Sequence, residues 1–256
     1  MSDLSIFDLG GRTALVTGAS RGIGKQLAEA LARAGADVAV TARDVASLSQ
    51  TEKAIKALGR KVYLFQLDVT VMDRGHTIMK IAQKTDGIDI LVNNAGIEDI
   101  RPSLDVDEAL WNKIIDTNLK GAFFCAQAVA RTMKDTGRHG TIINICSLTS
   151  EVGVPAAVPY GSSKTGLLGM TRGLAAEWAP FGIRVNAITP GYFRTAMTEV
   201  FYREDKWQEN MRSKIPLGRF GKLEDLSGAV IFLASSASEY MTGQSLIVDG
   251  GFLASI

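Results

Sequence analysis

Short runs of apolar and β-branched residues alternate along the chain with longer segments in which apolar positions recur at helical spacing. The first run leads into a glycine-rich stretch and then into a segment with Leu27 and Leu31 on one helical face. Near-continuous apolar strands joined by helical crossovers are typical of a parallel sheet covered on both faces. Seven strands are predicted, at residues 13–17, 38–41, 62–67, 88–92, 141–146, 184–189 and 245–248.

The spacing of these strands predicts one doubly wound α/β domain with a seven-stranded parallel sheet over residues 1–256. No linker rich in Pro or Ser, no repeat and no low-complexity segment divides the sequence. The rhythm breaks between the sixth and seventh strands, at residues 198–217, where aromatic residues stand among charged ones. We interpret this stretch as an inserted helical lid over a substrate, with an ordinary surface helix as the alternative.

Composition narrows the class of protein further. Lys and Arg number 28 against 27 Asp and Glu, and this balance argues against a nucleic-acid-binding protein, which needs a basic surface for phosphates. The sequence has no apolar run long enough to span a membrane, and its start lacks the features of a secretory signal. The two cysteines, Cys125 and Cys146, belong to no zinc-ligand pattern. We therefore expect a soluble, cytoplasmic protein without a metal site.

A glycine-rich turn stands where the first strand passes into the first helix. Residues 17–24 read TGASRGIG. Small residues let the backbone come close to a pyrophosphate, and the helix N-terminus supplies unpaired N–H groups and a partial positive charge. Because strand, turn and helix follow in the order of the dinucleotide-binding fingerprint, a turn built only for packing is the weaker interpretation. The predicted phosphate-binding residues are Gly18, Ser20, Arg21, Gly22, Ile23 and Gly24.

The end of the second strand predicts which dinucleotide is bound. An acidic residue there would hold a ribose 2′-hydroxyl, whereas an arginine accommodates a 2′-phosphate. This sequence has Arg43 at that place, with no carboxylate before Asp44, and Arg21 adds a second cation in the glycine-rich turn. The pattern favours NADP(H) over NAD(H), although Asp44 and a merely solvated Arg43 leave NAD(H) open as the alternative.

Candidate catalytic residues follow the fifth strand. Ser147 stands at its carboxyl end, and Tyr160 and Lys164 are spaced to share one helical face. Reducing a ketone with hydride requires a proton for the developing alkoxide, but a free tyrosine with a pKa of about 10 is a poor base near neutrality. An ammonium about 4 Å away is worth about 4 kcal/mol and would bring the pKa of Tyr160 to about 7. We therefore predict Tyr160 as the general acid–base and Ser147 as a hydrogen-bond donor to the substrate oxygen.

These motifs together resemble the short-chain dehydrogenase/reductase family over essentially the whole chain. The family's glycine motif, its Asn-Asn-Ala-Gly, its active-site Asn, Ser, Tyr and Lys, and its Pro-Gly all have counterparts here. The resemblance implies a Rossmann fold and a catalytic set of Asn118, Ser147, Tyr160 and Lys164, with Asn118 holding a water that relays protons from Lys164. It also implies further dinucleotide contacts at Asp68, Val69, Asn94, Ala95, Gly96, Tyr160, Lys164, Pro190, Gly191, Phe193 and Thr195.

The segments around Ser147 and Tyr160 and the C-terminal stretch resemble the gluconate 5-dehydrogenase branch of that family. Arg101 could pair with a substrate carboxylate through its planar guanidinium, and Glu151 could accept hydroxyl hydrogens. The branch implies both as gluconate contacts beside Ser147 and Tyr160. The alternatives are a surface loop charge for Arg101 and a rim carboxylate, or the holder of a cation, for Glu151.

The sequence thus predicts an NADP-dependent oxidoreductase that interconverts a gluconate-like sugar acid and its keto form. A 3-oxoacyl-thioester reductase is the alternative within the family, and a non-enzymatic nucleotide-sensing module is the alternative outside it. The resemblance also implies a homotetramer, while the charge balance and the lack of a long apolar run predict no nucleic-acid or membrane partner. The apolar tail, residues 249–256, suits burial against a neighbouring subunit, with packing inside its own chain as the alternative.

Overall fold

Seven parallel strands form the centre of the computed structural model, which describes residues 4–196, 198–199 and 201–256. The start of the sequence and one residue of the predicted lid therefore lie outside the described residues. All seven predicted strands are confirmed, with ends that differ from the prediction by a few residues. They are β1 (Thr13–Val16), β2 (Asp37–Ala42), β3 (Val62–Gln66), β4 (Ile90–Asn93), β5 (Gly140–Ile145), β6 (Ile183–Pro190) and β7 (Ser245–Val248).

The strand order β3-β2-β1-β4-β5-β6-β7 is that of a doubly wound sheet, as predicted. The chain winds outward from β1 in one direction to β3, then crosses to β4 and winds the other way to β7. Every neighbouring pair is parallel, with registers such as Leu15 opposite Ala39 and Leu15 opposite Leu91. The order reverses between β1 and β4, and the loops after these two strands therefore bound a crevice at the carboxyl edge.

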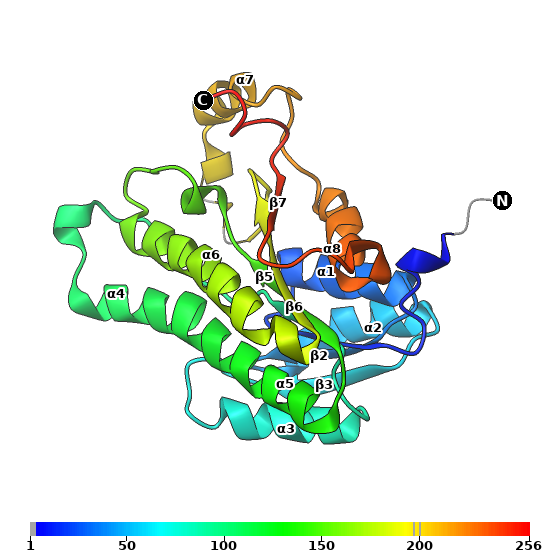
Figure 1. Ribbon diagram of the computed structural model, residues 1–256. Coiled ribbons are helices and arrows are strands. Elements are labelled where there is room, and N and C mark those ends of the chain that lie inside the picture. The colour runs from blue at the N-terminus through cyan, green and yellow to red at the C-terminus, as the bar shows by residue number, and fades with distance from the viewer. Residues whose placement is uncertain (1–3, 197, 200) are drawn as a thin grey trace.

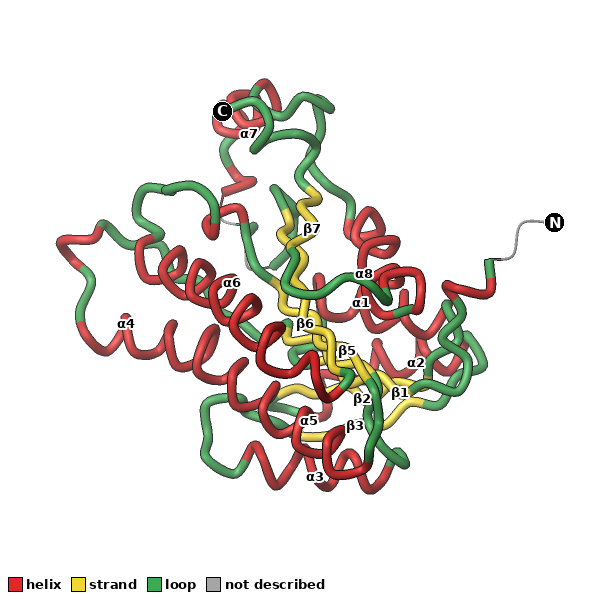
Figure 2. Tube along the Cα trace, viewed as in Figure 1, coloured by secondary structure: helices red, strands yellow, loops and turns green. Residues whose placement is uncertain are grey.

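Helices cover both faces of the sheet, as Figures 1 and 2 show. Helices α1, α2 and α8 lie against one face, and α3, α5 and α6 lie against the other. Among the described residues, none of the helices is long and apolar enough to cross a membrane. The α-helices are α1 (Gly22–Arg33), α2 (Ser49–Ala57), α3 (Arg74–Lys84), α4 (Glu108–Ile115), α5 (Ala122–Thr136), α6 (Val158–Trp178), α7 (Asp205–Ser213) and α8 (Ser227–Ala234).

Side chains of each central strand alternate between the two layers because successive residues of a strand point to opposite faces. Val38 and Val40 of β2 pack toward α1, whereas Ala39 between them packs toward the layer of α3 and α5. Leu27 and Leu31 of α1 are fully buried in the first of these layers. The apolar runs of the sequence are therefore continuous because both faces of the sheet are covered.

The segment between β6 and β7 contains α7, which stands above the carboxyl edge of the sheet next to the C-terminus (Figure 1). It lies within the predicted lid at residues 198–217, and a closing motion of this segment stays a prediction. Within the tail, Phe252 is buried in its own chain against Leu148 and Ile215, whereas Ile256 is exposed, and burial of the tail against a neighbouring subunit stays a prediction. The ring of Phe252 meets Tyr192 edge to face with 5.2 Å between the ring centres.

Candidate active site

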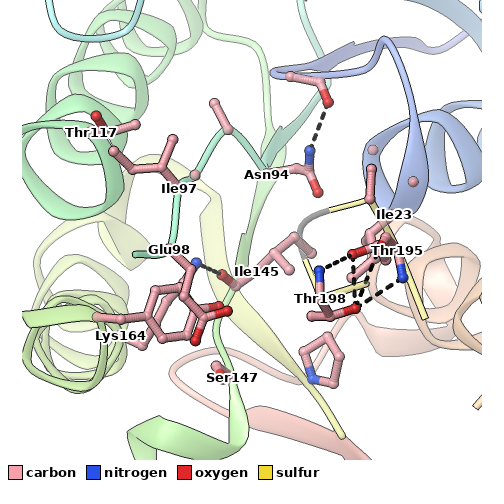
Figure 3. Close-up of a pocket in the computed structure, with 18 of the residues that line it drawn as sticks. Ile23, Asn94, Ile97, Glu98, Thr117, Ile145, Ser147, Lys164, Thr195 and Thr198 are labelled. Atoms are coloured by element: carbon pink, nitrogen blue, oxygen red, sulfur yellow. Dashed lines mark hydrogen bonds between the residues drawn. The ribbon is translucent and has the colours of Figure 1, made fainter. Parts of the chain in front are cut away.

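A cavity of about 750 Å³ opens at the carboxyl edge of the sheet and reaches Trp207 of α7. Its wall comes from the loops after β1 to β6 and from α6, so residues distant in sequence meet there. In Figure 3, Ile23, Asn94 and Thr195 lie on one side, and Glu98, Ser147 and Lys164 lie on the other. Ser147 and all residues predicted to contact a dinucleotide line the cavity: Gly18, Ser20, Arg21, Gly22, Ile23, Gly24, Arg43, Asp68, Val69, Asn94, Ala95, Gly96, Tyr160, Lys164, Pro190, Gly191, Phe193 and Thr195.

The glycine-rich turn is held in place by the loop after β4. The side-chain amide of Asn94 donates to the carbonyl oxygens of Thr17 and Gly18, each at 3.0 Å. In return the Thr17 hydroxyl accepts the backbone N–H groups of Asn94 and Ala95 at 3.0 and 3.1 Å. A Cβ on Gly24 would collide with Asn94 and with the Gly18 carbonyl, so the turn closes only with glycine there. The turn is thereby shaped as a rigid cradle of backbone.

The first helix begins at this cradle. Arg21, which stands at the N-cap of α1, has extended backbone, and the side chain of Arg21 makes no capping hydrogen bond. The first N–H groups of α1 therefore face a ligand site with a partial positive charge. Gly22 has φ +56°, and Thr195 lies within 3.7 Å of the place that a Cβ on Gly22 would occupy. A turn of small residues and a free helix N-terminus fit a pyrophosphate.

At the end of β2, Arg43 lines the cavity, whereas the carboxylate of Asp44 is hydrogen-bonded to its own loop. Arg43 lines the cavity beside Asp68. Burial acts to raise the pKa of Asp68, but hydrogen bonds from Thr70 and the charge of Arg43 hold it below its usual range. The Asp44 carboxylate accepts the backbone N–H of Ala46 at 3.0 Å and caps the short 3₁₀ helix that follows. Because Asp44 is engaged in this cap, the carboxylate that interacts with Arg43 at this end of the cavity is that of Asp68.

Ser147, Tyr160 and Lys164 converge at the opposite end, as Figure 3 shows for Ser147 and Lys164. The Ser147 hydroxyl hydrogen-bonds to the phenol of Tyr160 and also accepts the backbone N–H of Thr149 at 3.2 Å. Lys164 is 5% exposed, and its ammonium donates to the carbonyl of Ile145 at 2.7 Å. Strand β5 and helix α6 thus bring together the three groups predicted from their spacing.

The prediction that Lys164 brings the pKa of Tyr160 near neutrality is wrong for this arrangement. Burial raises the pKa of Tyr160 above its ordinary value, and the charge of Glu98 raises it further, while the hydrogen bond with Ser147 acts the other way. The Lys164 ammonium lies 5.6 Å from the centre of the tyrosine ring, and its own burial lowers the pKa of Lys164. Tyr160 is therefore held in its protonated form, which can give a proton to a carbonyl oxygen.

Asn118 lies behind the cavity wall in a π-helical segment, Asp116–Gly121, between α4 and α5. Its amide nitrogen donates to the carbonyl of Ile97 at 2.9 Å and to the hydroxyl of Ser163 at 3.1 Å. Its amide oxygen accepts the N–H of Ile97 at 2.8 Å. Asn118 therefore clamps the loop after β4 in place, and its part in a proton relay stays a prediction.

Several residues of the cavity wall were not singled out by the sequence analysis. Glu98, Tyr192, Tyr202 and Trp207 are among them, and the last two lie within the predicted lid. Burial raises the pKa of Glu98 to about 7, against the opposing charge of Lys164. The three aromatic rings pack edge to face, with Trp207 5.9 Å from Tyr192 and 5.3 Å from Tyr202 between ring centres. Glu98 directly follows Asn-Asn-Ala-Gly-Ile, so its distance from that motif was the one available signal.

Arg101 and Glu151 are not among the residues that line this cavity. The Arg101 guanidinium lies 3.6 Å from the carboxylate of Asp99, and its side chain is 39% exposed. Glu151 is exposed in the turn after Ser147. Within the described part of the chain, no group of three or more His, Cys, Asp or Glu side chains is arranged for a metal ion. Contact of Arg101 and Glu151 with a substrate stays a prediction.

Known proteins are similar to this chain in both sequence and fold. The family model described as enoyl-(acyl carrier protein) reductase, of the short-chain alcohol dehydrogenase type, matches residues 18–253. Gluconate 5-dehydrogenase of Gluconobacter oxydans (strain 621H) is 41% identical over the full length of both chains. A 3-oxoacyl-[acyl-carrier-protein] reductase of Staphylococcus aureus (strain N315) is 40% identical over 94% of this chain and 97% of its own.

Solved structures extend this likeness to three dimensions. A protein of Sinorhizobium meliloti 1021 named as a short-chain alcohol dehydrogenase is 58% identical, with a TM-score of 0.95 over 98% of this chain and all of its own. A gluconate 5-dehydrogenase of Burkholderia cenocepacia J2315, crystallised with NADP and tartrate, is 38% identical, with a TM-score of 0.95 over 98% of this chain and 99% of its own. This chain, with the fold, the glycine cradle and the serine, tyrosine and lysine in place, belongs to the short-chain dehydrogenase/reductase family.

Proposed function

We propose that this protein is an NADP-dependent oxidoreductase that interconverts a secondary alcohol and a ketone of a sugar acid, as a gluconate 5-dehydrogenase does. The observation that carries the proposal is one cavity with a dinucleotide cradle at one end and Ser147, Tyr160 and Lys164 at the other. The gluconate 5-dehydrogenases among its relatives, similar over nearly the whole chain, support the substrate class.

The residues present fit NADP. The backbone cradle around Gly18 and the free N-terminus of α1 suit the pyrophosphate, and Arg43 suits a 2′-phosphate because its guanidinium faces no competing carboxylate from Asp44. Lys164, with ammonium hydrogens beyond the one that Ile145 accepts, suits a ribose hydroxyl. The bound nicotinamide would supply the hydride for ketone reduction or take it up in alcohol oxidation.

The protein's own part is to orient the substrate and to move a proton. Ser147 donates a hydrogen bond to the substrate carbonyl oxygen, and Tyr160 gives that oxygen its proton as the carbon is reduced. The raised pKa of Tyr160 keeps this proton in place until the oxygen becomes basic. Lys164, close to the same ring, stabilises the phenolate that remains. In alcohol oxidation the same groups act in reverse.

Assay of the purified protein tests the proposal directly. NADPH consumption is followed with 5-keto-D-gluconate, an acetoacetyl thioester and simple ketones. We expect turnover of the keto acid with NADPH, and slower turnover with NADH. Turnover of the thioester alone would favour the alternative reductase, whose counterpart in Staphylococcus aureus is also similar to this chain. Nucleotide binding without turnover of any ketone would leave the nucleotide-sensing module as the function.

We also propose that Arg101 and Glu151 approach the substrate at the rim, and that the protein acts as a cytoplasmic homotetramer. The edge strand β7 supports assembly, because Ile247 on it is 47% exposed and offers an apolar side chain beside unpaired backbone groups. Light scattering on the purified protein measures the assembly, and a monomeric mass would contradict the tetramer.

A further inference from the structure

Glu98 stands at the catalytic end of the cavity with no structural task of its own. It follows Ile97, whose backbone N–H and carbonyl are both clamped by Asn118, so the position of Glu98 is fixed by two hydrogen bonds. Figure 3 shows its side chain extending to the region of Lys164 and Ser147. Among the described residues, no side chain or backbone group hydrogen-bonds or ion-pairs with its carboxyl group. A half-buried carboxyl group with this placement is available to a ligand.

The groups that face Glu98 come from two elements. Tyr160 and Lys164 of α6 interact electrostatically with its carboxylate, and so does Tyr192 in the loop after β6. The Lys164 ammonium is the cation among them, and it already donates to the carbonyl of Ile145. A substrate atom in contact with Tyr160 therefore also interacts electrostatically with the carboxylate of Glu98.

The other cations of the cavity wall lie elsewhere. Arg21 belongs to the glycine-rich turn and Arg43 to the end of β2. Lys113 lines the wall from α4, and the charge that acts on the pKa of Glu98 is that of Lys164, not that of Lys113. The wall beyond Tyr160 is made of uncharged residues: Leu148, Thr149, Val154, Tyr192, Tyr202 and Trp207. A substrate carboxylate placed directly beside the reacting carbon would thus face the carboxylate of Glu98, and the cation there, Lys164, already interacts with Glu98 and donates to the carbonyl of Ile145.

We propose that Glu98 determines which carbonyl of a keto acid reacts, by excluding a carboxylate from the position next to the reacting carbon and binding a hydroxyl group there. This inference rests on the proposed function. A carbonyl separated from the carboxylate by several hydroxylated carbons satisfies the site, because its neighbouring hydroxyl can donate to Glu98 while the carboxylate points to the rim. An α-keto acid cannot, because its carboxylate is attached to the reacting carbon. The preferred class is therefore a keto acid with a remote carbonyl.

The substitution Glu98→Gln tests this inference because it keeps the shape and the hydrogen bonding but removes the charge. We compare kcat/KM for 5-keto-D-gluconate and 2-keto-D-gluconate with NADPH at pH 8.5, above the pKa of about 7 to which burial raises Glu98, so that its carboxyl group is charged. The wild-type protein is expected to prefer the 5-keto acid, and the variant to narrow that preference by about 10- to 100-fold, as the removal of a like charge at contact range implies. The narrowing should come chiefly from faster reduction of the 2-keto acid.

Glu177→Gln is the matched control, since Glu177 is an exposed carboxylate on α6, the helix that carries Tyr160 and Lys164, and does not line the cavity. It should leave the 5-keto to 2-keto ratio unchanged. The methyl ester of 2-keto-D-gluconate is a second control, because it has no charge and should gain nothing from Glu98→Gln. NADPH binding, followed by fluorescence, confirms that each variant is folded. An unchanged ratio in a folded Glu98→Gln protein would overturn the inference.

Failure of the proposed function can be told apart from failure of this inference. If the wild-type protein reduces neither keto-gluconate, the sugar-acid proposal fails, and pyruvate and ethyl pyruvate then serve as a pair that differs in the charge beside the carbonyl. If the wild-type protein prefers ethyl pyruvate to pyruvate, and Glu98→Gln makes this preference smaller, the result supports the role of Glu98 in excluding a carboxylate. Equal ratios in both proteins contradict it.

Discussion

Lys164 is a buried lysine whose ammonium has three hydrogens and, among the described residues, one hydrogen-bond acceptor, the carbonyl of Ile145. Its burial lowers its pKa, and the charge of Glu98 acts in the opposite direction. Tyr160, next to it, is held protonated by burial. Before the reaction, the phenol of Tyr160 thus carries its proton. The ammonium of Lys164 stabilises the phenolate after that proton leaves.

Tyr160→Phe should lower kcat for ketone reduction by at least about 10²- to 10⁴-fold, because it removes the general acid while the ring still fills its place. NADPH binding should stay within about twofold of the wild-type value, since the cradle around Gly18 is distant from the phenol. Rapid single-turnover measurements check the rate, and fluorescence titration checks the binding. Turnover at the wild-type rate would remove Tyr160 from its role.

Arg43→Ala should raise KM for NADPH by about 10- to 100-fold, the worth of a charge-assisted hydrogen bond, and should change KM for NADH little. Steady-state kinetics with both dinucleotides provide the comparison. Asp44→Ala is the control, because Asp44 caps a short helix and leaves the 2′-phosphate site untouched. Equal effects of Arg43→Ala on the two dinucleotides would refute a contact with a 2′-phosphate.

The sequence predicted which residues are catalytic where their spacing along the chain fixes how close they lie in the fold. Tyr160 and Lys164 are four positions apart on one helix, so their proximity follows from the helical period. Glu98 was missed because its importance depends on burial and on neighbours from α6, which no local pattern records. The wrong pKa expectation for Tyr160 has the same origin, because desolvation is a property of the folded site.

At the scale of elements, the site depends on how closely the loop after β4 approaches the start of α1. The Asn94 amide bridges to the carbonyls of Thr17 and Gly18, and Gly24 passes so near that no Cβ fits. The hydrogen bonds from the Asn94 side chain to the backbone of the glycine-rich turn therefore fix the direction of the N-terminus of α1. The glycine spacing predicted the turn, and the resemblance implied Asn94 as a dinucleotide contact, whereas the hydrogen bonds from Asn94 to the turn come from the structure alone.

Gly24→Ala should weaken NADPH binding by at least about tenfold and lower the melting temperature, because the added methyl group pushes the Asn94 amide and the Gly18 carbonyl away. Gly75→Ala in α3 is the matched control, since a Cβ there meets nothing within 4 Å. That substitution should leave binding unchanged and should preserve or slightly raise stability. Fluorescence titration and thermal unfolding measure both effects, and wild-type affinity in Gly24→Ala would contradict the cradle.

At the scale of the whole molecule, the seven strands were predictable because a parallel sheet buried on both faces leaves continuous apolar runs in the sequence. The tail was less predictable, because an apolar residue such as Phe252 can be buried by its own chain or by a neighbour with the same sequence pattern. The positions of Arg101 and Glu151 depend on loop paths, which periodicity does not encode. Helices and strands follow from periodicity, whereas the orientation of loop residues requires the structure.

Stability should depend on pH through Glu98, whose pKa burial raises to about 7 in the folded protein. The folded state therefore binds this proton more tightly than the unfolded state, and the resulting stability is present at acidic pH and lost as pH rises through about 7. The glutamine side chain does not ionise, so Glu98→Gln removes this loss of stability with rising pH. We expect the variant to gain about 1–2 kcal/mol relative to wild type between pH 5 and pH 8.5, after allowance for solvent screening.

Thermal unfolding of the two proteins without ligand checks this expectation. The difference in melting temperature, variant minus wild type, should grow by roughly 3–6 °C from pH 5 to pH 8.5. Asp99→Asn, which changes a neighbouring ion-paired carboxylate, is the control and should show no such growth. A constant difference across the pH range would show that Glu98 is not protonated in the folded state.

The π-helical segment Asp116–Gly121 has a consequence for insertions and deletions in this protein. Such a segment arises from one extra residue in an otherwise α-helical rod, and each residue of an α-helix accounts for about 100° of rotation. Loss of a single residue there would restore a regular helix and rotate α4 by that angle relative to α5. Asn118 would then point away from Ile97, and the loop that carries Glu98 would lose both of its clamps. The length of this segment is therefore as restricted as the identity of the residues it positions.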